Sequence, residues 1–181
     1  MVPYQSVSMI RLGLEETPQF ELPAPYSIRT YRPGDERVWR RIQLEAEKYL
    51  EIGPQLFEEQ FGNDQDTLRE RQLFLCDGQG TEIGTAAAWF DPDHHGEPFG
   101  RVHWVAIVPG AQGRGLSKPL MSTVCNRLRD LGHDRACLGT HDVRLPAIAL
   151  YLKFGFVPEI RSEKDQQSWQ RVFMGLHGGS H

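Results

Sequence analysis

Hydrophobic and polar positions recur along this chain with two periods, which predict strands and helices in alternation. Period-two alternation and short apolar runs predict strands at residues 7–12, 26–31, 72–76, 82–90, 101–108, 135–140, 156–158 and 168–176. Spacings of three and four residues predict helices at residues 35–51, 55–61, 116–131 and 146–154. The polar, turn-rich residues 91–100 predict a loop. We therefore expect a mixed α/β domain.

Residue types at the ends of these segments sharpen the boundaries. Asp35 follows a Pro-Gly pair and is expected to be the N-cap of the first helix. Gly132 follows the apolar stripe of the long helix and is expected to be its C′ residue. The short strand at residues 7–12 is expected at an edge of the sheet.

Length, charge and cysteine usage narrow the function classes. The 181 residues suit one domain with a self-sufficient core. The formal net charge of −4 argues against nucleic acid or an acidic membrane as partner. Three separated cysteines without a C-x-x-C pair predict reduced thiols, and we find neither a signal peptide nor an apolar run of about 20 residues. We expect a cytoplasmic protein.

The loop after the strand at residues 101–108 is the most informative stretch. Gly110, Gly113 and Gly115 lie between that apolar strand and the start of a helix. Glycines let backbone N–H groups converge on an anion, and the helix start adds unpaired donors and a positive dipole end. Arg114 and Lys118 add positive charge. The stretch suits a pyrophosphate, although glycines needed only for turn geometry explain it equally well.

Two sequence motifs at matching spacing favour the pyrophosphate-binding interpretation of this loop over the turn interpretation. Residues 112–117, Gln-Gly-Arg-Gly-Leu-Ser, resemble the Q/R-x-x-G-x-G/A signature of the GNAT superfamily of acyl-CoA N-acyltransferases. Residues 146–156 resemble the A-x-x-L-Y-x-x-x-G-F helix-to-strand signature of the same family. The resemblance covers about residues 26–176. Ser117 stands where the family usually has Gly or Ala, and Arg144 where it often has Asn.

The resemblance implies a fold and an activity. The GNAT fold is a mixed, mostly antiparallel sheet of about six or seven strands flanked by about four helices. Residues 1–25 would be an N-terminal extension with the edge strand, residues 26–176 the GNAT N-acetyltransferase domain, and residues 177–181 a loose tail. The implied reaction is direct transfer of an acetyl group from acetyl-CoA to a primary amine of a small molecule or peptide, in a ternary complex. No metal is implied, and the protein would be a monomer or a homodimer.

The matched positions also imply binding residues. The pantetheine arm would lie on the backbone of Val105, Ala106 and Ile107. The residues implied in holding the remainder of acetyl-CoA are Gln112, Gly113, Arg114, Gly115, Leu116, Ser117 and Lys118, with Arg144 as a further phosphate contact. In this family the segment between the first two helices lines the acceptor pocket. The candidate acceptor contacts there are Glu45, Tyr49 and Phe57.

Two residues are candidates for proton transfer. Tyr151 matches the family tyrosine that often protonates the departing CoA sulfur, and a phenol with a reference pKa near 10 suits that role. The alternative for Tyr151 is packing on the helix stripe. His103 matches a strand position at which family members often place a base, and period two puts it on one face with Val105. A buried histidine satisfied by a backbone carbonyl is an equally good interpretation of His103.

The segment before Arg101 contains a cluster of Asp and His residues, and two functions other than acetyl transfer are also considered. Asp91, Asp93, His94 and His95 resemble metal ligands, but their Pro- and Gly-containing segment favours a solvated turn. The alternatives to an N-acetyltransferase are a module that binds acyl-CoA without turnover and a structural protein whose glycines serve only turns. Acceptor choice would depend on the first-helix segment, the loop before Arg101 and the last hairpin, which carry no portable code.

Overall fold

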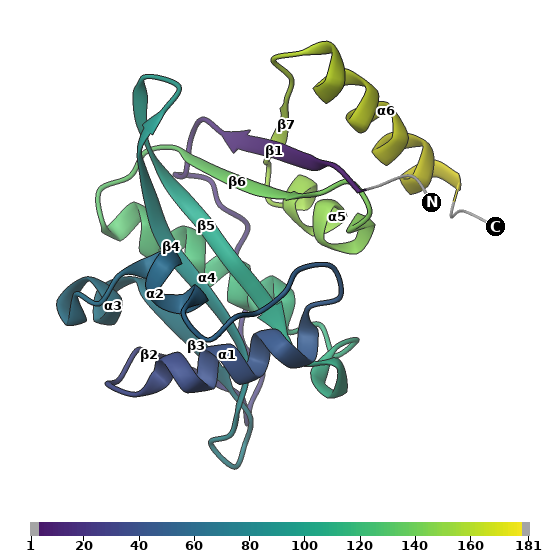
Figure 1. Ribbon diagram of the computed structural model, residues 1–181. Helices are drawn as coiled ribbons and strands as arrows, with labels where there is room; N and C mark the ends of the chain where they lie inside the picture. The colour runs from purple at the N-terminus through teal and green to yellow at the C-terminus, as the bar shows by residue number, and fades with distance from the viewer. Residues whose placement is uncertain (1–3, 179–181) are drawn as a thin grey trace.

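The computed structural model describes residues 4–178, which contain one seven-stranded sheet and six α-helices (Figure 1). The strands are β1 (Ser6–Arg11), β2 (Ser27–Thr30), β3 (Gln72–Cys76), β4 (Glu82–His94), β5 (Glu97–Ile107), β6 (Ala136–His141) and β7 (Val157–Glu159). The helices are α1 (Asp35–Ala46), α2 (Leu56–Phe61), α3 (Gln65–Arg71), α4 (Ser117–Asp130), α5 (Leu145–Lys153) and α6 (Glu163–Gly178), with a 3-10 turn, η1, at Pro109–Ala111. The predicted fold class is confirmed, since every strand pair described is antiparallel except β5 with β6.

The sheet opens in its middle. The strand order is β2-β3-β4-β5-β6-β1-β7. The parallel pair in the centre is joined in register at Gly100 with Ala136 and at Arg101 with Cys137. Beyond this point β6 turns away from β5, as Figure 1 shows. Neighbouring strands normally stay about 4.8 Å apart, so the divergence exposes the second half of β5 between the two halves of the sheet.

Two core clusters cover opposite faces. The first packs α4, α5 and α6 on the sheet and includes the fully buried Leu120, Phe154 and Trp169. The second packs the three N-terminal helices and includes the fully buried Trp39 and Phe74. The predicted stripe of α4 is confirmed, and Gly132 ends this helix as predicted. Its φ is 87°, and its N–H donates to Arg129 O at 2.9 Å.

The prediction that the first strand lies at an edge is wrong. β1 pairs antiparallel with β6 on one side and with β7 on the other. Val7 and Met9 are buried in the first core cluster. The apolar residues of β1 pack on a helical layer, and both edges of the strand are hydrogen-bonded to neighbouring strands. A strand near the start of the chain can therefore lie inside the sheet. The division of the chain at residue 25 remains a prediction, and residues 1–3 and 179–181 lie outside the described part.

The first helix is shorter than its polar and apolar spacing predicted. Gly34, with a φ of 98°, is its N-cap, so Asp35 is the first helical residue and not the cap. The helix ends at Ala46, and Glu47 is extended. The carboxylate of Glu47 accepts the backbone N–H groups of the next three residues, which would otherwise bond within a continued helix. Residues 47–51 are therefore not helical.

The loop predicted at residues 91–100 is instead a β-hairpin. β4 continues to His94, β5 begins at Glu97, and the turn between them has positive φ at His95 (55°) and Gly96 (94°). Positive φ at both central residues is the signature of a type I′ hairpin turn. The Pro and Asp residues suggested a break, but the tight turn keeps the two strands paired.

Two further helices were not predicted. The strand expected at residues 168–176 is part of α6, because Trp169 and Val172 are buried three residues apart, at helical spacing. The short α3 is capped by Asp64, whose side chain accepts the N–H of Thr67. The structure thus has six described helices where about four were expected, and no C-terminal hairpin within residues 4–178.

Strict alternation along β5 breaks at Trp104, which has a φ of 50°. His103 pairs with Ala87 and Ala106 with Thr85, so two residues of β5 face one residue of β4. This bulge moves His103 to the face of the N-terminal helices, where its ring packs edge-on against Phe61. Val105 packs against the opposite core cluster. The prediction that His103 and Val105 share a face is wrong.

Candidate active site

Two cavities lie where β5 and β6 diverge. The loop cavity, about 320 Å³, is lined by residues 105–107, 111–113 and 115–117 and by one face of α5. The histidine cavity, about 380 Å³, is lined by residues 6–8, 101–105 and 139–141, by side chains from α1, α2 and α5, and by Glu47, Leu50 and Arg144. Val105, Ala147 and Tyr151 line both cavities. The two spaces therefore meet at these three residues.

The glycine loop forms one wall of the loop cavity. Gly113 and Gly115 have φ values of 75° and 76°, a backbone conformation that other residues adopt at a cost. A Cβ at either glycine would meet nothing within 4 Å, so the glycines are needed for conformation and not for packing. The Gln112 side chain donates to Ile107 O at 2.8 Å and ties the loop to the end of β5.

The start of α4 faces the same cavity. Ser117 is its first residue, Leu116 precedes it as N-cap, and no side chain caps the first turn. The first N–H groups of a helix have no intrahelical partner, and the aligned dipoles place positive charge at this end. Glycines in the left-handed region, followed by an uncapped 14-residue helix, form a backbone cradle suited to a pyrophosphate.

The basic residues predicted to join this site lie outside the cavity lining. Arg114 is exposed and donates to Tyr26 Oη at 3.2 Å and Gly110 O at 2.9 Å. The Nζ of Lys118 lies 5.6 Å from the ring centroid of Phe20. Arg144 lines the histidine cavity instead. The structure thus brings residues 105–107, Gln112, Gly113 and 115–117 together and leaves the three cations at other places.

Tyr151 stands on the wall shared by the two cavities. Its side chain is buried and packs on the ring of Phe156, and burial raises the pKa of its phenol to about 12. Among residues 4–178, no hydrogen bond to its hydroxyl is present. The two interpretations of this residue are compatible, because the ring packs in the core while the side chain still reaches both cavities.

His103 is held in one tautomer. Its Nε2 lies 3.0 Å from Gln60 Oε1, which also accepts the Nε1–H of Trp104 at 2.9 Å. Because an amide oxygen only accepts, Nε2 carries the proton and Nδ1 keeps a lone pair. Burial, together with the charge of Arg101, lowers the pKa of His103 to about 3. The ring is therefore neutral at physiological pH, with a side-chain amide as its partner.

An ion pair connects the end of α1 to the start of α5 beside the histidine cavity. Arg144 Nη2 lies 2.7 Å from both carboxylate oxygens of Glu47. The guanidinium also lies 5.1 Å from the ring centroid of Tyr49, and the hydroxyl of Tyr4 donates to Tyr49 O at 2.7 Å. These contacts fix the segment between the first two helices against the β6–α5 turn.

The candidate acceptor residues are not brought together. Glu45 is exposed and pairs with Arg41 on the outer face of α1. Phe57 is buried in the core beneath α1. Tyr49 is half-exposed over Arg144 and is not part of the cavity lining. The expected segment does reach the histidine cavity, but through Glu47 and Leu50.

Sequence reasoning missed several polar residues of the histidine cavity: Gln43, Glu47, Gln60 and His141. Gln43 is buried and donates to Trp104 O at 3.1 Å, so two glutamines hold the bulge from α1 and α2. His141 ends β6, and burial lowers its pKa. A signal was present for Gln43, which is a polar residue next to Ile42 on the buried face of a helix.

The lengths and hydrophobicity of the described helices can be compared with those of a membrane-spanning helix. Across residues 4–178, the helices are too short or too polar to serve as a membrane span.

Known proteins resemble this chain in sequence and in fold. A profile described as the acetyltransferase (GNAT) family matches residues 37–156. The chain is 32% identical over 160 residues to a mycothiol acetyltransferase from Thermomonospora curvata, covering 81% of this chain and 50% of that protein. A solved GCN5-related N-acetyltransferase from Sphaerobacter thermophilus superposes with a TM-score of 0.67 at 22% identity, covering 86% of this chain and 50% of that one.

A second solved structure is of similar size to this chain. The ribosomal-protein-S18-alanine N-acetyltransferase from Escherichia coli superposes with a TM-score of 0.62 at 19% identity, over 75% of this chain and 79% of that one. At these identities the two solved structures show the fold alone. The chain spans about half the length of the curated relatives it matches. Because the family profile covers more than half of the sequence, the chain belongs to the acetyltransferase (GNAT) family.

Proposed function

We propose that this protein transfers an acetyl group from acetyl-CoA to a primary amine of a small molecule or peptide. The observation that carries the proposal is the meeting of two cavities at Tyr151, one walled by an anion cradle and the other by polar side chains. Family membership supports acyl transfer in general. The curated relatives are named mycothiol acetyltransferases, and this chain matches about half of their length, so the acceptor proposed here is given only as a class.

The loop cavity fits acetyl-CoA. Gly113 and Gly115 give the loop its left-handed backbone conformation, and the start of α4 presents backbone donors to a pyrophosphate. The backbone of residues 105–107, where β5 has lost β6 as a neighbour, suits the amide groups of a pantetheine arm. Arg114 belongs to the glycine loop and Lys118 to the first turn of α4, so both would add positive charge near the pyrophosphate, whereas Arg144 is engaged by Glu47. Bound acetyl-CoA would supply the acetyl group as a thioester.

The chain's own groups then meet three chemical demands. The neutral amine attacks the thioester carbonyl, a C–N bond forms, and the C–S bond breaks. Tyr151, with a pKa of about 12, donates its hydroxyl proton to the departing thiolate, and the phenolate then takes up the proton that the attacking nitrogen loses as the amide forms. We propose that backbone N–H groups at the bulge around Trp104, where the pairing of β5 with β4 is interrupted, stabilise the oxyanion.

Deprotonation of the amine is the third demand. A His103 whose pKa is about 3 is a weak base toward an ammonium ion. We propose that His103 orders the acceptor or a water as a neutral group, and that the ammonium proton leaves to solvent. His103 remains a candidate base only if acceptor binding changes its surroundings.

A coupled assay tests the function. Release of free thiol from acetyl-CoA is followed over a panel of primary amines and N-terminal peptides, and acetyl-CoA binding is measured by isothermal titration. Amine-dependent thiol release supports the proposal. Binding without turnover on every amine would instead indicate an acyl-CoA sensor. Absence of binding at millimolar acetyl-CoA would reject both and leave a structural role for the glycines.

A further inference from the structure

The tip of the β4–β5 hairpin places two histidines next to a glutamate of β7, a strand that lies more than 60 residues later in the sequence. His94 Nε2 lies 3.0 Å from Glu159 Oε2, and His95 Nε2 lies 3.8 Å from Glu159 Oε1. One ligand atom from each of these three residues lies within 4.8 Å of the other two. Neither histidine lines either cavity described above.

We propose that His94, His95 and Glu159 form a Zn²⁺ site. Two imidazole nitrogens and one carboxylate are a ligand set that zinc uses with a water in the fourth position. Bonds of about 2.0–2.2 Å in a tetrahedron place ligand atoms about 3.3–3.6 Å apart. The separations of 3.0 and 3.8 Å differ from this range by a few tenths of an ångström, which small side-chain rotations would close. The site would be formed by the hairpin turn and β7, segments that the sheet order places on opposite sides of β6 and β1.

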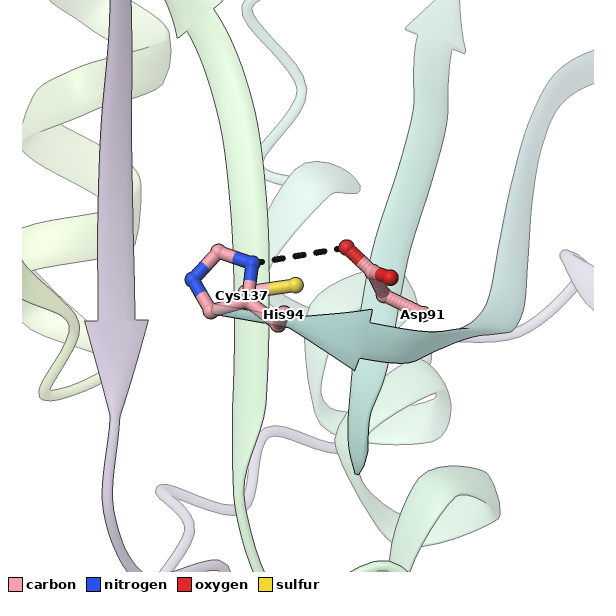
Figure 2. Close-up of side chains that lie close together, drawn as sticks. All are labelled: Asp91, His94 and Cys137. Atoms are coloured by element: carbon pink, nitrogen blue, oxygen red, sulfur yellow. Dashed lines mark hydrogen bonds and ion pairs between the residues drawn. The ribbon is translucent and has the colours of Figure 1, made fainter. Parts of the chain in front are cut away.

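A carboxylate behind His94 supports this assignment. The Nδ1 of His94 lies 3.4 Å from Asp91 Oδ2, as Figure 2 shows, so the ring is placed between two carboxylates. Metal-binding histidines generally donate their second ring N–H to such an acceptor. With that proton on Nδ1, the Nε2 lone pair faces Glu159 at 3.0 Å, and two acceptors at this distance require a cation or a proton between them.

The turn places the second histidine. His95 has a φ of 55°, in a hairpin position that favours Asn or Gly. Its ring centroid lies 4.7 Å from that of His94. The arrangement predicted from sequence as a solvated turn is thus a pair of adjacent imidazoles, of which His94 is half-buried, beside the buried Glu159.

Two neighbours define the limits of the ligand set. Arg161 Nε donates to Glu159 Oε1 at 2.9 Å, which leaves Oε2, the oxygen nearer His94, for an ion. His95, whose Nε2 lies 3.8 Å from Oε1, must therefore turn toward Oε2 when the ion binds. The buried sulfur of Cys137 lies beside the His94–Asp91 pair in Figure 2 and is the competing ligand for a metal on that side of the ring. The proposal places the ion on the Glu159 side.

Zinc titration of the full chain tests the site. After chelator treatment, Zn²⁺ is titrated in competition with a chromophoric chelator, and one equivalent is expected to bind with a Kd below about 1 μM. Asp91→Asn should weaken binding about 10–100-fold, because the carboxylate only orients His94. Loss of a ligand should cost more than that. His95→Asn is the best such variant, since Asn tolerates the left-handed conformation of the turn.

The matched control is His177→Asn, which removes an exposed histidine on α6 and should bind zinc like the unaltered chain. Failure of the chain to bind one zinc at micromolar concentration, or equal affinity in His95→Asn, would overturn the proposal and leave His94 in contact with two carboxylates and no metal. Co²⁺ replacing Zn²⁺ gives a second readout that needs no variant. We expect the visible absorption bands of tetrahedral Co²⁺ and no sulfur-to-metal charge-transfer band. A sulfur-to-metal charge-transfer band would assign the ion to Cys137 instead.

Discussion

Both carboxylate oxygens of Glu47 lie 2.7 Å from Nη2 of Arg144, across 97 residues of sequence. The side chain of Glu47 is only 4% exposed. Burial by itself favours the protonated carboxyl, but hydrogen bonds from Arg144 and from the backbone N–H groups of Tyr49 and Lys48 outweigh it, so the pKa of Glu47 is lowered. The pair therefore keeps a charged carboxylate in the wall of the histidine cavity and holds residues 47–50 out of the helix.

Replacing Arg144 should show how much the charged Glu47 carboxylate depends on its ion pair. Arg144→Met leaves the buried Glu47 charge without its main partner, and we expect the free energy of unfolding at pH 7 to fall by about 1.5–3 kcal/mol. A carboxyl with a lowered pKa contributes stability above its unfolded pKa of about 4.3 and loses it as pH falls through the folded pKa. The loss in Arg144→Met should therefore shrink below about pH 4. Urea unfolding at pH 7 and pH 3.5 measures it.

A surface pair supplies the comparison. Arg69 bonds Asp66 at 2.9 Å, with side chains 50% and 92% exposed. Arg69→Met should cost less than about 1 kcal/mol, because water screens and replaces the interaction. Equal losses in the two variants would show that the Glu47–Arg144 contact contributes no more than a surface pair.

Removing the Tyr151 hydroxyl should impair turnover and not binding. Tyr151→Phe is expected to lower kcat about 100- to 10,000-fold, the usual contribution of a positioned acid, with little change in KM for acetyl-CoA. Because burial raises the pKa of Tyr151 to about 12, the hydroxyl stays protonated over the assay range. The loss should thus be similar at pH 6 and pH 9. Steady-state kinetics at both pH values measures it.

Tyr26→Phe is the control for that substitution. It also removes one phenol oxygen, which accepts from Arg114 on the outer side of the glycine loop. Its kcat should match that of the unaltered protein. A Tyr151→Phe enzyme with normal kcat would leave Tyr151 as a packing residue, the alternative considered from sequence.

His103 should make the protein less stable in mild acid. Burial, together with the charge of Arg101, lowers its pKa to about 3, whereas an unfolded histidine binds its proton near pH 6.5. The unfolded state therefore binds more protons between these values, and stability falls as pH drops, by up to about 1.4 kcal/mol per pH unit from this group. His103→Gln should flatten the dependence of the unfolding free energy on pH between about 6 and 4.

His177→Gln, which removes an exposed histidine from α6, is the reference substitution for this measurement. The same His103→Gln variant also separates the two roles of the ring in catalysis. A neutral ordering group predicts a lower kcat/KM with the acidic limb of the pH profile in place. Movement of that limb would restore His103 as the general base.

Much of the fold was predictable, because helical stripes and glycine ends are local signals. Leu120 and Gly132 mark α4 in the sequence as clearly as in the structure. The wrong predictions of secondary structure arise where a few specific contacts outweigh the local hydrophobic pattern. Glu47 ends α1 by capturing the next N–H groups, and His95 closes a hairpin in a segment with the composition of a loop. Neither capture nor turn type is encoded in hydrophobic periodicity.

The candidate site divides in the same way. The glycine loop and Tyr151 belong to contiguous motifs and could be placed from sequence. Gln43 and Gln60 act through contacts with Trp104 on β5, and such long-range contacts follow only from the packing of helices on the sheet. The bulge at Trp104 also reversed the side on which His103 was expected, since one extra residue exchanges the two faces of a strand.

Backbone conformation, rather than space, should make the glycine loop sensitive to substitution. Gly113→Ala and Gly115→Ala place a methyl group where nothing lies within 4 Å, but force φ values of 75° and 76° on an L-residue. In the free variant the loop relaxes out of this conformation, and acetyl-CoA must restore it at a cost of about 1–2 kcal/mol, which corresponds to an affinity lower by about 5- to 30-fold. Isothermal titration with acetyl-CoA measures the change.

Gly110→Ala distinguishes conformation from crowding in this loop. A Cβ at Gly110 also meets nothing within 4 Å, but this glycine lies outside the left-handed region. Its affinity for acetyl-CoA should therefore equal that of the unaltered protein. Equal weakening in all three alanine variants would mean that the cradle rejects any side chain near the phosphate. Unchanged affinity in all three would mean that the left-handed glycines serve only the turn, and that acetyl-CoA is held by other parts of the chain.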